Sequence, residues 1–209
     1  CDVECTDQGI VMDMDTPDDY QRIIAAASKN KIPTIEDCQR LFTRYRVSEG
    51  VIRHGWAVAN TAKKLARYLN ERGGCFLNIE LITAAGLLHD LAKGQPNHAQ
   101  RGAAILEKEG FPAVAHLVAA HMDLGLDFEK DYLKIDEKAV VYLVDKIIDQ
   151  EHIGSIEGRF SKAFKKYAND EEILQNIKNK QEQALLLKEK IEYILDIEDL
   201  YSFLALKEG

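Results

Sequence analysis

The most constraining feature of this chain is a run of small and apolar residues that recur at alternating steps of four and three. These residues are Val51, Gly55, Val58, Ala62, Leu65 and Leu69. Such steps place side chains on one face of an α-helix, here as one buried stripe. We therefore predict a long helix that begins at Ser48 and ends at Gly73-Gly74, since glycine is common where helices stop.

Most of the remaining chain also has the pattern of helices, so the predicted fold class is all-α. Thr16-Pro17 supplies an N-cap and a first-turn proline, and Thr34 followed by Asp37 marks another helix start. Helices are predicted over residues 16–29, from 34 through 42, and over 79–93, 97–109, 112–121, 136–150, 155–167, 171–193 and 200–206. Residues 123–134 are predicted as a loop and residues 9–13 as a strand.

The acidic charge is concentrated at the start of the chain. The 209 residues carry a net charge of −8, and residues 1–20 contribute −7 of it, with seven Asp or Glu and no Lys or Arg. The rest of the chain therefore sums to about −1, the difference between these two values. A near-neutral body without a basic stripe argues against general nucleic-acid binding. A small phosphorylated substrate remains compatible, because metal ions can supply positive charge.

Composition favours a soluble cytoplasmic protein with one sizeable core, or one domain plus an extra piece. Hydrophobic residues make up 46% of the chain and charged residues 30%, as in globular proteins. The four cysteines lack the paired spacing of a zinc site, and a reducing compartment is the simpler inference. No apolar stretch approaches the ~20 residues that span a bilayer, so no membrane partner is expected. Since Cys1 replaces an initiator methionine, we expect a fragment of a longer protein.

Six polar residues lie in or beside apolar helical runs, where an unpaired imidazole or carboxylate is costly to bury. They are His54, His89, Asp90, His98, His121 and Asp145. Nitrogen and oxygen ligands of this kind, gathered from several helices, are what a two-metal hydrolytic centre requires.

Each of the six residues also has a plainer interpretation. His54 fits a histidine at the edge of the core that bonds to a carbonyl, and His98 and His121 fit polar residues at helix ends. Asp145 interrupts the apolar face of residues 140–148, and Lys146 could pair with it, although consecutive helical residues face different directions. His116 is about 140° around the helix from His121 and is left out. No role is assigned to His152.

The order of the six residues resembles that of the HD-domain metal-dependent phosphohydrolases: a lone His, His-Asp, up to two further His, then Asp. Residues 87–94 (Leu-Leu-His-Asp-Leu-Ala-Lys-Gly) and 142–147 (Tyr-Leu-Val-Asp-Lys-Ile) look like the family's two main motifs. His98 with Gly102-Ala103, and Ala119-Ala120-His121, are similar to the second-metal portion of the two-metal branch. Residues 155–160 resemble the stretch that follows the last Asp in related bacterial chains. The likeness covers about residues 48 to 165 and implies an HD-domain helical bundle.

The resemblance implies a role for each matching residue. His54, His89, Asp90 and Asp145 would surround a first divalent ion, and Asp90 would bridge to a second ion held by His98 and His121. Imidazole and carboxylate ligands suit Fe, Mn, Co, Ni or Zn. Lys93 and Lys146 would act in catalysis with Asp90, by stabilising charge on the phosphate. Arg101 and Arg159 are further substrate-binding residues. A helix C-terminal cation at Lys93 and a solvent-facing Lys146 are the alternatives for the two lysines.

Residues 8–20 resemble the end of nucleotidyltransferases of the molybdenum-cofactor guanylyl/cytidylyltransferase type, in which a final strand leads into an Asp-Thr-Pro helix start. The expected organisation is a tail of such a domain over 1–20, linker helices over 21–47, the HD metal-binding domain over 48–168 and a helical extension over 169–209. Capping chemistry alone also explains residues 16–19.

The preferred hypothesis is a metal-dependent phosphohydrolase that cleaves a nucleotide or another small phosphate ester. A second hypothesis is a regulatory module that binds metal and nucleotide without turnover, within a larger nucleotidyltransferase. In a third, the histidines are core-edge residues and the helix at 171–193 is the surface of a homodimer.

Overall fold

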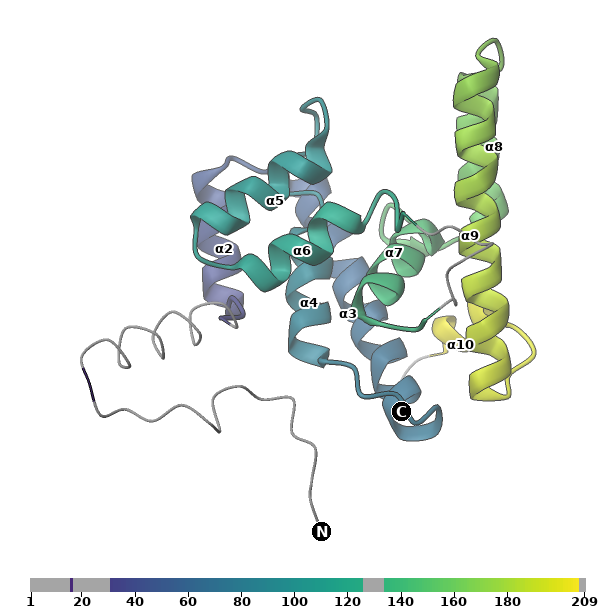
Figure 1. Ribbon diagram of the computed structural model, residues 1–209, viewed down its shortest axis with the longest axis horizontal. Helices are drawn as coiled ribbons and strands as arrows, with labels where there is room; N and C mark the ends of the chain where they lie inside the picture. The colour runs from purple at the N-terminus through teal and green to yellow at the C-terminus, as the bar shows by residue number, and fades with distance from the viewer. Residues whose placement is uncertain (1–15, 17–30, 126–133, 207–209) are drawn as a thin grey trace.

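The structure, a computed structural model, describes residue 16, residues 31–125 and residues 134–206. The expected strand at 9–13, the helix at 16–29 and the acidic beginning therefore lie outside the described residues. Within the described ranges the protein is helical, apart from one two-stranded pair. The all-α prediction is confirmed (Figure 1).

The described chain contains nine helices and two short strands. In chain order they are α2 (Ile35–Arg44), α3 (Glu49–Arg72), α4 (Ile79–Leu88), α5 (His98–Lys108), α6 (Pro112–Ala120), α7 (Glu137–Ile147), β1 (Ile148–Asp149), β2 (His152–Ile153), α8 (Ile156–Lys166), α9 (Glu171–Leu195) and α10 (Leu200–Ala205). No helix of the described chain has both the length and the apolar character needed to cross a membrane.

Helix starts follow the capping residues that the sequence predicts. Thr34 and Asp37 form a reciprocal capping box at the start of α2. The Ser155 side chain accepts a hydrogen bond from the Gly158 amide at the start of α8. Ser48 precedes α3 as predicted, but its side chain makes no capping hydrogen bond. These boundaries are local, which is why the sequence predicts them.

Helices α3 and α4 approach closely because glycine stands at two crossing points. A Cβ atom on Gly55 would lie 2.7 Å from the Leu87 carbonyl oxygen, and one on Gly86 would lie 2.8 Å from Cα of Ala59. Both distances are shorter than any packed contact, so a side chain there would push the helices apart. The close approach brings the residue before Gly55 near the end of α4. That residue is His54.

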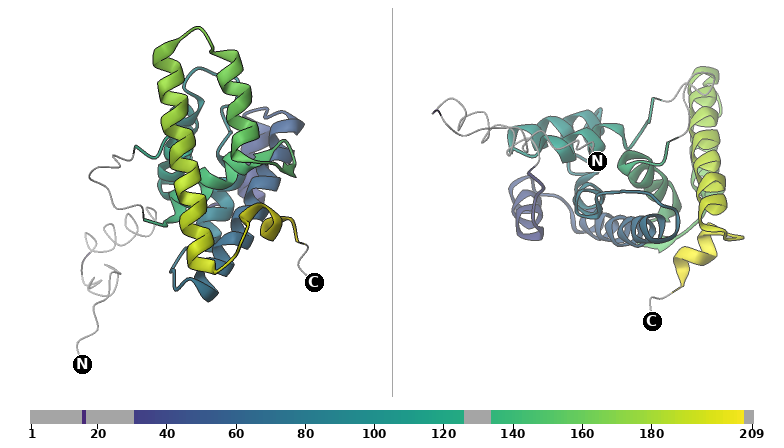
Figure 2. Two further views of the ribbon diagram at one scale, coloured as in Figure 1. Left: turned by 90° about the vertical axis from the view of Figure 1, so that its right-hand side faces the viewer. Right: turned by 60° about the horizontal axis from the view of Figure 1, so that its bottom comes forward.

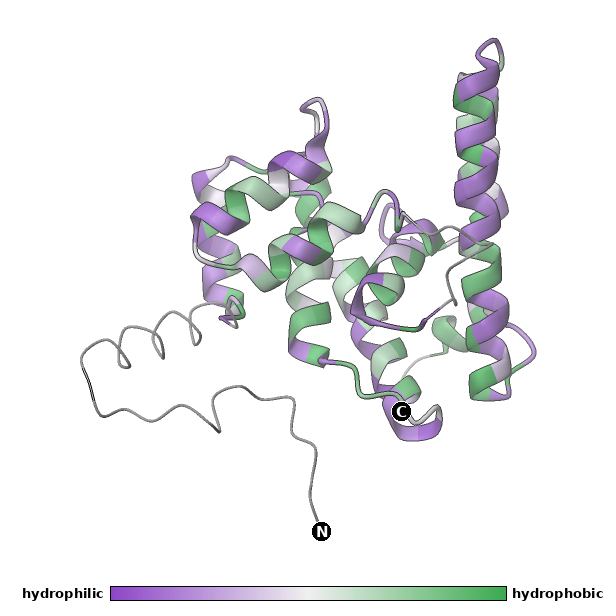
Figure 3. Cartoon of the chain, in the orientation of Figure 1, coloured by the Kyte–Doolittle hydropathy of each residue, from purple (hydrophilic) through white to green (hydrophobic). Residues whose placement is uncertain are grey.

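Helices α3, α4 and α7 occupy the middle of the molecule, with α5, α6 and α2 on one side and α8 and α9 on the other (Figures 1 and 2). Helices α8 and α9 run side by side in opposite directions, and α9 packs its buried Ala184, Leu187 and Ile191 toward the body. Figure 3 shows that the outer part of this hairpin is mainly hydrophilic, whereas α4 and α6 are largely hydrophobic. The apolar core therefore lies between the central helices.

Two predicted helices end earlier than expected. The helix predicted to reach Lys93 ends at Leu88, and residues 89–94 form turns with the Leu91 amide bonded to the Leu88 carbonyl. The helix predicted to reach Gln150 ends at Ile147 and leads into the β1–β2 hairpin, which the sequence pattern does not predict. A hairpin of two paired residues a side has too little periodicity to be detected from sequence. Both shortened ends lie at the cluster of polar residues.

Candidate metal centre

Five segments of the fold deliver the six polar residues to one place. His54 comes from α3 and Asp145 from α7, while His98 is the first residue of α5 and His121 follows the last residue of α6. His89 and Asp90 lie in the turn after α4. In the described chain, the ligand atoms form two groups in which all lie within 4.8 Å of one another: His54, His89 and Asp145 (the first triad), and Asp90, His98 and His121 (the second triad).

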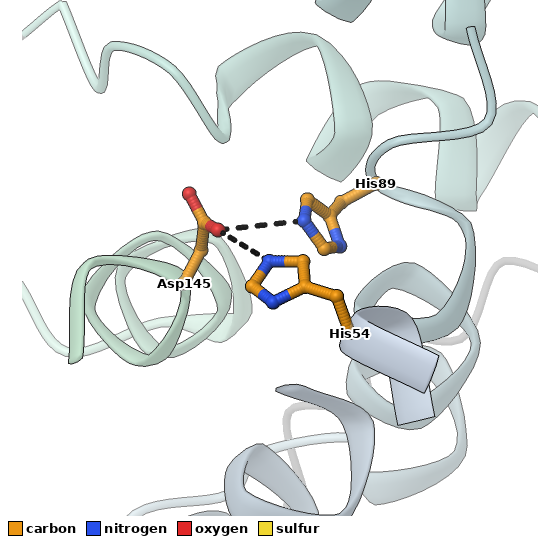
Figure 4. Close-up of side chains that lie close together, drawn as sticks. All are labelled: His54, His89 and Asp145. Atoms are coloured by element: carbon orange, nitrogen blue, oxygen red, sulfur yellow. Dashed lines mark hydrogen bonds and ion pairs between the residues drawn. The ribbon is translucent and has the colours of Figure 1, made fainter. Parts of the chain in front are cut away.

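The first triad is built around one carboxylate oxygen. Oδ1 of Asp145 lies 3.2 Å from Nε2 of His54 and 3.4 Å from Nε2 of His89. Figure 4 shows both rings turned toward this carboxylate. The other ring nitrogen of each histidine contacts a main-chain carbonyl: Nδ1 of His54 is 2.7 Å from the Gln150 oxygen, and Nδ1 of His89 is 2.8 Å from the Gly86 oxygen. Carbonyls thus orient both rings.

The second triad is also built around one carboxylate oxygen. Oδ1 of Asp90 lies 3.2 Å from Nε2 of His98 and 3.8 Å from Nε2 of His121. Nδ1 of His121 is 2.6 Å from the Val118 carbonyl oxygen. The other oxygen of Asp90, Oδ2, is 3.4 Å from Nε2 of His89 in the first triad. Asp90 therefore belongs to the second triad and also contacts the first.

The buried atoms of this cluster fit divalent metal ions. A neutral imidazole that donates from Nδ1 to a carbonyl has only a lone pair at Nε2. Nε2 of His121 then faces Oδ1 of Asp90, so a lone pair meets a lone pair there. Nε2 of His89, His98 and His121 and Oδ1 of Asp90 are all buried without hydrogen-bond partners. A cation among them would resolve this repulsion, and metal-binding histidines commonly donate their other nitrogen to a carbonyl.

Burial and charge shift the pKa values of the cluster in different directions. Burial lowers the pKa of His89, but contacts with the Asp145 and Asp90 carboxylates outweigh it and raise the pKa to about 9. Burial lowers the pKa of His121 to about 3. Burial raises the pKa of Asp90 and Asp145, yet neighbouring cations and rings hold both values well below the usual range. Without metal, a proton on His89 therefore balances the carboxylates.

A pocket of about 360 Å³ opens beside the two triads. It is lined by Gly50, Val51, Arg53, His54, Asp90, Lys93, Gln150, Glu151 and Arg159. Nζ of Lys93 lies 2.7 Å from Oδ2 of Asp90, and Nη2 of Arg159 lies 3.2 Å from Oδ1 of Asp145. Both cations thus face the pocket while touching a carboxylate of the cluster.

Comparison with protein families gives a match for this arrangement. The model of the HD domain matches residues 51–185, well over half of the chain. The chain belongs to the HD domain family. The family is generally made of metal-dependent hydrolases of the phosphohydrolase superfamily. The two triads of this HD domain are candidate metal-binding groups in keeping with that membership.

Two curated relatives match about half of this HD-domain chain. One is a tRNA (cytidine(56)-2'-O)-methyltransferase of Thermoplasma volcanium, 33% identical over 103 residues, which cover 47% of this chain and 29% of the relative. The other is an uncharacterized protein of Methanocaldococcus jannaschii, 33% identical over 115 residues, which cover 48% of this chain and 68% of the relative. The chain thus spans under a third of the methyltransferase. No solved structure matches.

Two of the predicted substrate-binding cations do not line the pocket of this HD domain. Lys146 is only 4% exposed, because it lies among α7, Asp145 and the end of α6. Burial lowers the pKa of Lys146, although Asp145 opposes the shift. Arg101 is exposed on α5 and donates to the Gln95 side chain at 3.1 Å. His116 and His152, which were given no role, are exposed.

Two residues near the site were not predicted. Arg53 lines the pocket and its Nε lies 2.7 Å from Oε1 of Glu151. Its position next to His54 could have drawn attention to it. Gln150 acts through its main-chain carbonyl and has a positive φ of 57°. Since any residue has a carbonyl, no side-chain pattern could reveal this role.

Proposed function

We propose that this HD domain is a metal-dependent phosphohydrolase that cleaves a nucleotide or another small phosphate ester. The observation that carries the proposal is the set of unpaired Nε2 and Oδ1 atoms buried beside a pocket lined with cations. His54, His89 and Asp145 would hold one ion, His98 and His121 another, and Asp90 would contact both. Bound there, divalent ions would polarise phosphoryl oxygens and lower the pKa of a water molecule.

The charge of the site supports an anionic substrate. Lys93, Lys146 and Arg159 contact the two carboxylates of the cluster, so three positive charges oppose two negative ones. Divalent ions would make the site strongly positive, which favours a multiply charged anion such as a phosphate group. The pocket is also large enough for a small ligand, within the usual range for such sites.

Lys93 and Arg159 have the position from which to orient the substrate. Both line the pocket, and both touch a carboxylate of the cluster. Once Asp90 binds metal, the Lys93 ammonium, which is 46% exposed, is available to a phosphoryl oxygen. Arg159 is held in place by its bond to the Ile148 carbonyl at 2.9 Å. Cations fixed in this way stabilise charge that develops on the equatorial oxygens.

A panel of nucleotides, dinucleotides and generic phosphate esters, assayed for released phosphate with added Fe, Mn or Co, tests the proposal. We expect metal-dependent turnover that Asp90→Ala abolishes while the circular dichroism spectrum is kept. Metal and nucleotide binding without turnover by the wild type would favour the regulatory module instead. A wild type that binds no metal would contradict both.

A further inference from the structure

Of the cationic side chains at the site, Lys146 is the most deeply buried. Its relative exposure is 4%, and it lies on α7 directly after Asp145. A buried ammonium requires acceptors for its three N–H groups, because it has left water. The position of those acceptors decides what the residue can do.

All the acceptors of Lys146 belong to the protein. Nζ donates to Oδ2 of Asp145 at 2.8 Å and to the main-chain oxygen of His121 at 2.9 Å. Nζ also lies 4.8 Å from the centre of the Tyr142 ring, a cation–π distance. Two of its N–H groups thus have protein acceptors, and an aromatic face lies beside the ammonium. The ammonium is held by the protein and is not part of the pocket lining.

The two hydrogen bonds join the two triads. Asp145 belongs to the first triad, and His121 belongs to the second. His121 follows the last residue of α6, where helix carbonyls lack partners and a cation is favourable. With Oδ2 of Asp145 held by Lys146, Oδ1 is the oxygen left to face His54 and His89.

We propose that Lys146 is a positioning residue that sets the separation of the two metal-binding triads, an inference that rests on the proposed metal centre. Its two hydrogen bonds connect α7 to the end of α6, and it does not line the pocket. Lys93 differs in this respect. Its ammonium also touches a carboxylate of the cluster, at 2.7 Å from Asp90, but it lies at the open pocket and makes no bond that joins the triads.

Titration with Mn²⁺ alone tests this role, with Lys146→Met as the variant and Lys93→Met as the matched control. Calorimetry gives the affinities, and electron paramagnetic resonance distinguishes a spin-coupled Mn²⁺ pair from isolated ions. We expect the wild type and Lys93→Met to bind a coupled pair. Lys146→Met should lose the coupled signal and bind one of the two ions about 10- to 100-fold more weakly, as for other residues that orient metal ligands.

Lys146→Gln is a second variant, in case Lys146→Met does not fold. Its amide can donate to one of the two acceptors but carries no charge. It should bind the weaker ion less tightly than the wild type, and its circular dichroism should be unchanged. A coupled pair of wild-type affinity in both variants would overturn the inference and leave the proposed function intact. Absence of Mn²⁺ binding by the wild type would overturn both. Failure of both variants to fold would assign Lys146 to the core alone and also overturn it.

Discussion

The rings of His89 and His121 meet edge to face with their centroids 5.1 Å apart. The first ring belongs to the first triad and the second ring to the second triad. The two triads are thus neighbours across a single ring contact, and Asp90 faces both. Ions held by the two triads would therefore lie close enough to act together on one phosphate group.

Loss of His98 should remove one ion and retain the other. His98 is part of the second triad only, so His98→Ala should lower the metal content from two ions to one per chain. His116→Ala is the control, because His116 is exposed and lies outside both triads. Elemental analysis after equilibration with Mn²⁺ measures the ratio. Two ions retained in His98→Ala would contradict the assignment of the second triad.

Loss of Lys93 should impair turnover without loss of metal. Lys93→Met removes a cation that lines the pocket, and we expect kcat to fall about 10²- to 10³-fold, as when one group that stabilises developing charge is removed. Arg101→Met, at an exposed position away from the pocket, should leave the rate unchanged. Steady-state kinetics on the best substrate of the panel makes the comparison. Equal losses in the two variants would argue against a specific role for Lys93.

Metal binding should strengthen as pH rises and should release a proton. The pKa of His89 is raised to about 9 in the metal-free protein, so its Nε2 is protonated at neutral pH. An ion must displace that proton, and apparent affinity should rise about tenfold per pH unit below 9. Calorimetric titrations with Mn²⁺ at several pH values, in buffers of different ionisation enthalpy, count the protons released. A pH-independent affinity would be inconsistent with this account.

The same pKa values predict how the stability of the metal-free protein depends on pH. The raised pKa of His89 gives stability that is complete below its unfolded value of 6.5 and is lost as pH rises toward 9. The lowered pKa of His121 gives stability that is present above 6.5 and is lost as pH falls toward 3. Urea unfolding of the chelator-treated protein should therefore give a free energy of unfolding that is largest between about pH 3 and about pH 9 and falls toward both values.

A methyl group at Gly55 should disturb both the fold and the site. Because a Cβ there would lie 2.7 Å from the Leu87 carbonyl, Gly55→Ala must separate α3 from α4. We expect a loss of about 1–3 kcal/mol in the free energy of unfolding and weaker Mn²⁺ binding through displacement of His54. Gly50→Ala, in the same helix but with nothing within 4 Å of its Cβ, is the control. Its stability should be unchanged or higher by up to about 1 kcal/mol.

The sequence by itself determined the helical class, most helix starts and the six residues of the cluster. Capping at Thr34 and Ser155 and the stripe through residues 51–69 depend on neighbours within a few positions, so they can be read from the chain. Buried polar residues in apolar runs are also visible in sequence, since their burial must be compensated wherever the helices pack.

The family resemblance already divided these residues between two ions, but only the tertiary structure decided which atoms meet and what surrounds them. α4 ends at Leu88, and the turn that follows sends His89 to one triad and Asp90 to the other. The Gln150 carbonyl reaches His54 through a hairpin turn, and the Lys146 ammonium points to the end of α6 instead of into the pocket. Such contacts join distant segments, often through main-chain atoms that every residue has, and so no local pattern encodes them.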